Sequence, residues 1–232
     1  MRVNIKSLPY RIFIYAVACG LSIAVVNFIT TSLIHRISTT SSMLFPVLTI
    51  SLMGFHIMIA CFMGMKYLCD KKQLYLAPIA FAFTCSALLM LGTIGSYPDW
   101  LVCAQGREIN QNDALIFYFF RNIMMAILFI AAIFLYRVRH LTAHSRKIHG
   151  AVLMICFIFI SATLILSWVH SSNSSLLSIE FIDNLTYTFT PLWHNRIGWL
   201  LIIIWSLTLI LLIGLTRLRN IFSVSYTHLR AY

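Results

Sequence analysis

The sequence predicts an all-α integral membrane protein, a bundle of about six transmembrane helices with the N and C termini in the cytoplasm. Hydrophobic residues make up 60% of the 232-residue chain, charged residues make up only 10%, and the mean hydropathy is +0.89. Soluble domains carry about 25% charged residues. Lipid rather than water is therefore the expected solvent for most of this chain, which excludes an ordinary soluble enzyme.

Six apolar runs are long enough to cross a hydrocarbon core of about 30 Å at about 1.5 Å per helical residue. We expect spans at residues 12–34, 43–65, 74–96, 114–136, 150–170 and 197–216. The links between these runs are too short to hold a soluble domain. Residues 1–223 are therefore expected to form a single membrane-embedded unit.

The formal net charge of +11 is distributed unevenly between the two sets of span ends. One set carries most of the lysines and arginines, among them Lys6, Lys71, Arg139 and Arg217, and the other set carries most of the acids. An excess of Lys and Arg marks the cytoplasmic side of a membrane protein. The bilayer is therefore the expected partner of the basic residues, and we expect no nucleic-acid partner.

Arg121 is the single charged residue of the apolar run 114–136. A cation at the bilayer centre costs about 2.5–3.5 kcal/mol on insertion scales. Tyr118 lies on the same face of the predicted helix, whereas Asp113, next to Asn112 at the start of the run, is about 12 Å away and too far to pair directly. These residues are candidates for a polar site that senses a ligand. The other interpretation, which the sequence favours, is a structural hub of interhelical hydrogen bonds.

His56 is the histidine placed deepest in a predicted span. It could ligate a haem, but no second histidine lies at a matching depth, so we expect an interhelical hydrogen bond instead. His35, His170, His194 and Cys103 are expected near the outer surface, where such side chains could bind zinc or copper. No spacing ties these four residues together, so we expect neither a metal nor a cofactor.

No Asp or Glu lies inside a predicted span, and no HExxH, GxSxG or P-loop motif occurs. Intramembrane enzymes and proton-coupled carriers normally need ionisable groups at depth. A small transporter or channel subunit therefore stands as the alternative function, and a membrane haem or quinone protein as a third. The chain by itself is not expected to be an enzyme.

Five short stretches carry a family resemblance in the order in which they occur. They are residues 69–74 (CDKKQL), 80–83 (AFAF), 111–113 (QND), 116–122 (IFYFFRN) and 205–208 (WSLT). Together they resemble the bacterial membrane-associated sensor domains of the fourth MASE family. The combination of QND with FFRN is the most specific part of this resemblance.

The resemblance implies a sensory input module in the bacterial inner membrane. In that family the sensor is normally followed by further spans and by a cytoplasmic GGDEF domain that makes cyclic di-GMP. It also implies that the protein forms a homodimer. The signal that it implies is a small molecule, a lipid or a redox change. This chain departs from the pattern because it has about six spans rather than about eight, and because no GG[DE]EF motif occurs in it. We therefore expect an incomplete sensor domain at residues 1–223.

The end of the chain has a different character. Residues 224–231 read VSYTHLRA, which is similar to one reading frame of a transposon adapter used in sequencing libraries. We expect residues 224–232 to be translated adapter, with a genuine short tail as the alternative.

Overall fold

The computed structural model describes residues 17, 20–21, 24–25, 44–96, 111–139, 145–172 and 196–216. The chain divides into two compact units, one formed by Met1–Phe45 with Thr216–Tyr232 and the other by Pro46–Leu215. Most of the predicted span at residues 12–34 lies outside the described residues, although the described positions within it are helical. That span and the side on which each terminus lies stay predictions.

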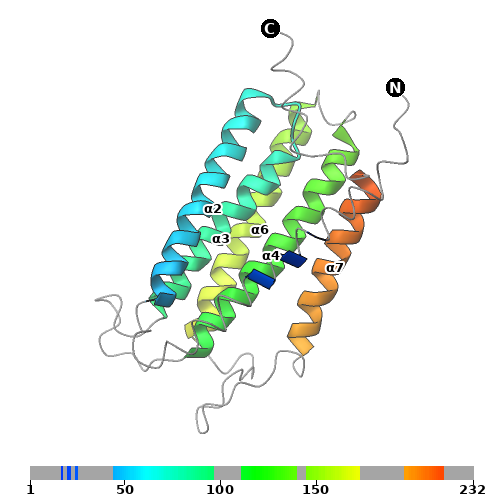
Figure 1. Ribbon diagram of the computed structural model, residues 1–232. Helices are drawn as coiled ribbons and strands as arrows, with labels where there is room; N and C mark the ends of the chain where they lie inside the picture. The colour runs from blue at the N-terminus through cyan, green and yellow to red at the C-terminus, as the bar shows by residue number, and fades with distance from the viewer. Residues whose placement is uncertain are drawn as a thin grey trace. The chain divides into compact units, whose positions relative to one another are not determined.

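The described part of the second unit consists of helices, with a turn between the first two, and contains no strand (Figure 1). The helices are α2 (Leu44–Cys69), α3 (Leu76–Gly95), α4 (Gln111–Arg137), α6 (Arg146–Ser172) and α7 (Arg196–Thr216). Five helices among the described residues are long and apolar enough to cross a membrane, which confirms an all-helical membrane protein. α2 and α6 extend past the predicted apolar runs to include Lys66 and Arg146, because long basic side chains can reach water from the end of a membrane helix.

α3, α4 and α6 form the packed centre of this unit. α3 packs most extensively on α4, and both helices contact α6. The rings of Tyr75 and Tyr136 meet at one end, with centroids 5.2 Å apart. Near the other end, a Cβ atom added at Gly92 would lie 2.6 Å from Cε1 of Phe117. α3 and α4 are therefore antiparallel, and the missing side chain at Gly92 allows the Phe117 ring to approach the α3 backbone closely.

Small and flexible side chains fill the space between these three helices. The buried cluster consists of Ala82, Cys85, Leu89, Phe117, Met124, Met125, Leu128, Cys156 and Ile160. Large apolar side chains also cover the outward faces, as at Phe55 and Ile210, which are 58% and 65% exposed. Helices that are apolar all round are typical of membrane spans, so these outward faces are the surfaces that lipid covers.

The turn between α2 and α3 is ordered by the carboxylate of Asp70. Its Oδ1 accepts a hydrogen bond from the backbone N–H of Lys72 at 3.1 Å, and its Oδ2 accepts one from Nε2 of Gln73 at 2.9 Å. The Tyr75 hydroxyl donates to Oε1 of Gln73 at 3.1 Å. Burial raises the pKa of Tyr75, as do Tyr136 and Asp70, while the charge of Arg139 lowers it. Because the net change is upward, this phenol stays protonated and can donate to Gln73 at neutral pH.

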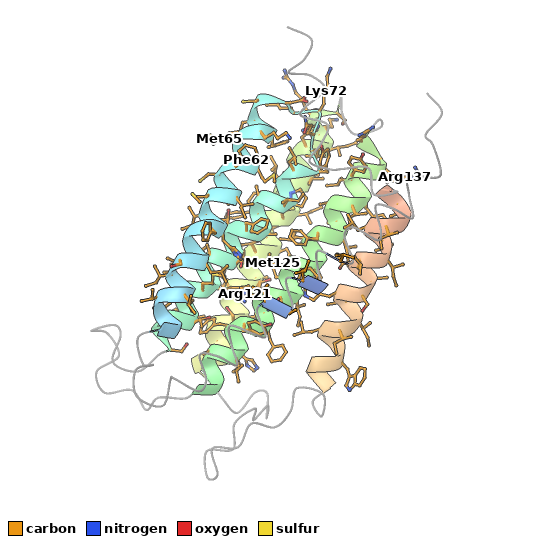
Figure 2. The ribbon with its side chains drawn as sticks, viewed as in Figure 1. Phe62, Met65, Lys72, Arg121, Met125 and Arg137 are labelled. Atoms are coloured by element: carbon orange, nitrogen blue, oxygen red, sulfur yellow. The ribbon has the colours of Figure 1, made fainter. Side chains whose placement is uncertain are left out.

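Two contacts between aromatic side chains join the helix ends that carry the basic residues. Tyr75 joins the α2–α3 turn to Tyr136 on α4, and the Tyr67 hydroxyl lies 3.3 Å from Nδ1 of His149, which joins α2 to α6. Figure 2 shows Lys72 and Arg137 at this same end. The basic end comprises Lys66, Lys71, Lys72, Arg137, Arg139, Arg146 and Lys147. The charge pattern of the sequence predicts this gathering and assigns it to the cytoplasmic side.

Candidate functional site

Arg121 lies on α4, about 15 Å from the first residue of that helix and hence well inside the membrane span (Figure 2). Its Cζ atom lies 5.0 Å from the centroid of the Tyr118 ring, within range of a cation–π interaction. The neighbouring Asn122 turns its amide back onto its own helix, where Nδ2 donates to the Tyr118 carbonyl at 2.9 Å. The ring of Tyr118 is therefore the described group that meets the guanidinium directly.

His56 makes the interhelical hydrogen bond that its depth in α2 predicts. Its Nδ1 lies 2.8 Å from Oγ of Ser86 on α3, and Ser86 is completely buried. The imidazole tautomer decides which of the two groups donates. The edge of the His56 ring also meets Phe83, with centroids 5.1 Å apart and ring planes at 87°. A neutral polar contact thus crosses from α2 to α3 inside the apolar bundle.

Two polar contacts lie inside the bundle. His56 has a partner on α3, Ser86, and Arg121 has a partner on its own helix, the ring of Tyr118. These four side chains, from α2, α3 and α4, are called the polar node below. Asn112 and Asp113, the remaining candidates from the sequence, belong to the first turn of α4, but their side chains lie outside the description. Their part in the site stays a prediction.

The polar node has the chemistry of a binding site for an anion or a carbonyl group. A guanidinium carries five N–H donors. Among the residues that the structure describes, no side chain or backbone oxygen is seen to accept a hydrogen bond from Arg121, and no carboxylate pairs with it. His56 adds a ring nitrogen that can donate or accept. The node therefore offers hydrogen-bond donors to an anion or a carbonyl group.

Sequence analysis did not find the contribution of α3. Ser86 and Phe83 look like ordinary members of an apolar helix, and only the structure identifies them as partners of His56. The signal that could have found Ser86 is a hydroxyl residue placed at the same depth as His56 on the adjacent antiparallel span. Such a placement is common for interhelical hydrogen bonds in membranes.

His170 lies in the last turn of α6, at the end of the span where the sequence places it, but its side chain is buried. It lies on α6 with only 7% of its surface exposed, and its ring is 6.1 Å from that of Phe120. Its Nε2 atom is buried with no hydrogen-bond partner among the described residues. Thr163 and Ser167 are buried on the same face of α6, at the three- and four-residue spacing of a helix. That spacing is visible in the sequence and marks the inward face of α6.

Most of the candidate metal ligands lie outside the described part of the chain. Within those residues no group of three or more His, Cys, Asp or Glu side chains could hold a metal ion. Cys61, Cys69, Cys85 and Cys156 are free thiols. The remaining candidates, His35, His194 and Cys103, lie outside the described residues.

An apolar cavity of about 330 Å³ lies between α2 and α3. It is lined by Met53, Ile57, Ala60, Cys61, Thr84, Ala87, Leu88 and Leu91. Leu88 and Leu91 are 43% and 50% exposed, so this side of α3 is open to the surroundings of the bundle. The lining suits hydrocarbon and offers no charged group.

The apolar outer faces and the membrane-length helices define a multi-pass integral membrane protein with a polar node inside its bundle. A comparison with protein families identifies the kind of membrane protein. Residues 39–230 match MASE4, described as membrane-associated sensor, integral membrane domain, and the chain belongs to this family. No solved structure matches the chain.

Proposed function

We propose that this chain is the input module of a bacterial signalling protein and that it regulates a cytoplasmic diguanylate cyclase. Membership of the membrane-associated sensor family supports the sensory role. The cyclase is inferred from the family's general association with GGDEF domains, a motif that does not occur in this chain. The proposal therefore assigns cyclic di-GMP synthesis to another part of the complete protein and no catalysis to these residues.

The observation that carries the mechanism is the position of Arg121 inside the bundle, where its guanidinium lies over the Tyr118 ring. An unneutralised cation in the membrane costs about 2.5–3.5 kcal/mol. A difference of that size between two helix packings shifts their populations by about a hundredfold. A signal that interacts more favourably with one packing would therefore change the output.

Several parts of the proposal rest on the family context alone. The site of action is the bacterial inner membrane, and the signal is a small molecule, a lipid or a redox change. The functional assembly is a homodimer, because cyclic di-GMP synthesis in this enzyme class brings two GGDEF domains together. Reading the gene past the codon for Ser223 tests this context, since the proposal expects the frame to continue through further spans to a GGDEF motif.

The polar node is tested by Arg121→Gln and Arg121→Leu in the complete protein. We expect both variants to reach the membrane in normal amounts and to change cyclic di-GMP output in one common direction, because both remove the cation. Membrane abundance is measured by immunoblot and output by the cellular content of cyclic di-GMP. Arg146→Gln removes one positive charge from the basic end and serves as the matched control with unchanged output.

Two other outcomes would decide against a signalling role. Loss of protein from the membrane in both Arg121 variants would make the residue a structural hub. Normal abundance with normal output would remove the polar node from the mechanism, even if the complete protein is a cyclase.

A further inference from the structure

The basic end presents several exposed cations. The carboxylate of Asp70, in the same region, is already hydrogen-bonded within the turn. Lys71 and Lys72 are exposed in the α2–α3 turn, and Arg137 is exposed at the last residue of α4. Both oxygens of Asp70 accept hydrogen bonds from the turn itself, from the Lys72 backbone and the Gln73 side chain. The carboxylate is thus held within the turn, and the cationic side chains face outward.

A pair of tyrosines holds the turn and the end of α4 together. Tyr75 and Tyr136 meet edge to face, with ring planes at 89°. Cζ of Arg139 lies 4.9 Å from the centroid of the Tyr136 ring, on the same side of the unit. Tyr75 donates to Gln73, and Gln73 donates to Asp70, so a chain of contacts joins Arg139 to the turn.

Lysines of the turn and arginines at and just after the end of α4 therefore lie at one end of the unit, and this group is called the basic cradle here. Its members are Lys71, Lys72, Arg137 and Arg139. Figure 2 shows Lys72 of the turn and Arg137 of α4 at the same end of the unit. The cradle lies where the apolar spans Val47–Cys69, Leu76–Gly95 and Ala114–Arg137 reach their ends. This is the depth at which a bilayer changes from hydrocarbon to headgroups.

We propose that the basic cradle binds the phosphate of anionic phospholipid headgroups. Arg and Lys donate charge-assisted hydrogen bonds to phosphate. Basic sites between helix ends on the cytoplasmic side bind anionic headgroups in other membrane proteins. An acidic protein surface offers the same charge, but the position of the cations at the ends of the membrane-length helices favours a lipid. The proposal does not depend on the signalling function.

The experiment uses the purified chain in phosphatidylcholine vesicles that contain spin-labelled phosphatidylglycerol or, in a parallel sample, spin-labelled phosphatidylcholine. The measured quantity is the preference for the anionic label, that is, the fraction of spin-labelled phosphatidylglycerol bound at the protein relative to that of spin-labelled phosphatidylcholine. We expect Lys72→Gln/Arg139→Gln to lower this preference at least about fivefold, which corresponds to the loss of about 1 kcal/mol of headgroup binding at the site. Lys71→Gln/Lys72→Gln, which leaves the Tyr136 contact intact, should also lower it.

The matched control is Arg146→Gln/Lys147→Gln, which removes the same charge from exposed positions at the start of α6. It should retain most of the preference if the cradle is a site. Equal losses from the cradle and control variants would mean that net charge alone attracts the lipid, which overturns the proposal. No preference in the unmodified protein would also overturn it and would leave an acidic protein surface as the partner to test.

Discussion

The hydrogen bond between His56 and Ser86 is a single polar contact that ties α2 to α3 within the membrane. A lipid environment offers no water to replace a lost partner, so an unpaired ring nitrogen carries a free-energy cost. Double-mutant cycles on hydrogen bonds between membrane helices give about 0.6 kcal/mol on average and about 1.7 kcal/mol at most. The contact is therefore strong enough to bias helix packing and weak enough to be reversible.

At this residue pair we expect Ser86→Ala and His56→Leu to show a coupling free energy of about 0.6–1.7 kcal/mol. The measurement is the unfolding free energy of the two single variants and the double variant in bicelles. Ser51→Ala is the matched control, because the Ser51 hydroxyl bonds only to the Val47 carbonyl of its own helix. Strictly additive single-variant effects at His56 and Ser86 would show that the contact contributes nothing.

The antiparallel pair α3 and α4 depends on a glycine where the two helices come closest. Gly92 faces the buried ring of Phe117, and the first carbon of any side chain would collide with three of its ring atoms. Phe117 is only 5% exposed, so the ring has little space into which it can move. Close packing of this kind is the main attraction between helices in lipid.

We therefore expect Gly92→Ala to lower the unfolding free energy by about 1–3 kcal/mol, as overpacking does in tightly packed cores. Gly54→Ala on α2 is the matched control, since nothing lies within 4 Å of a Cβ atom built there. The control should be neutral or slightly stabilising, because Ala is the better helix former. Equal stability of the two variants, measured by unfolding in bicelles, would contradict the close approach of α3 and α4.

At the level of elements, the apolar runs predicted the positions of α2, α3, α4, α6 and α7, because hydropathy alone selects segments that can span a membrane. The inward faces could not be predicted in the same way. A membrane helix is apolar on its lipid side as well as its packed side. For this reason the burial of Ser86 and His170 appeared only in the structure, whereas Arg121 and His56 stood out as polar residues in apolar runs.

At the scale of the whole molecule, both proposals require a bundle that crosses the bilayer with its basic links on one side. The described helices support this arrangement, since α3 alone has 20 residues and spans about 30 Å. Tyr75 and Tyr136 meet at the basic end, so the α2–α3 turn and the end of α4 must face the same compartment. This arrangement is required because the polar node needs a lipid environment and the basic cradle needs lipid headgroups.

The most direct measurement is labelling with a membrane-impermeant maleimide in intact cells and in inverted vesicles, in a background whose native cysteines are replaced by Ser. Lys71→Cys and Arg139→Cys should react only in inverted vesicles, and Ser96→Cys, at the far end of α3, only in intact cells. Reaction of Lys71→Cys and Arg139→Cys from opposite sides would contradict the fold, the charge assignment and the lipid site together.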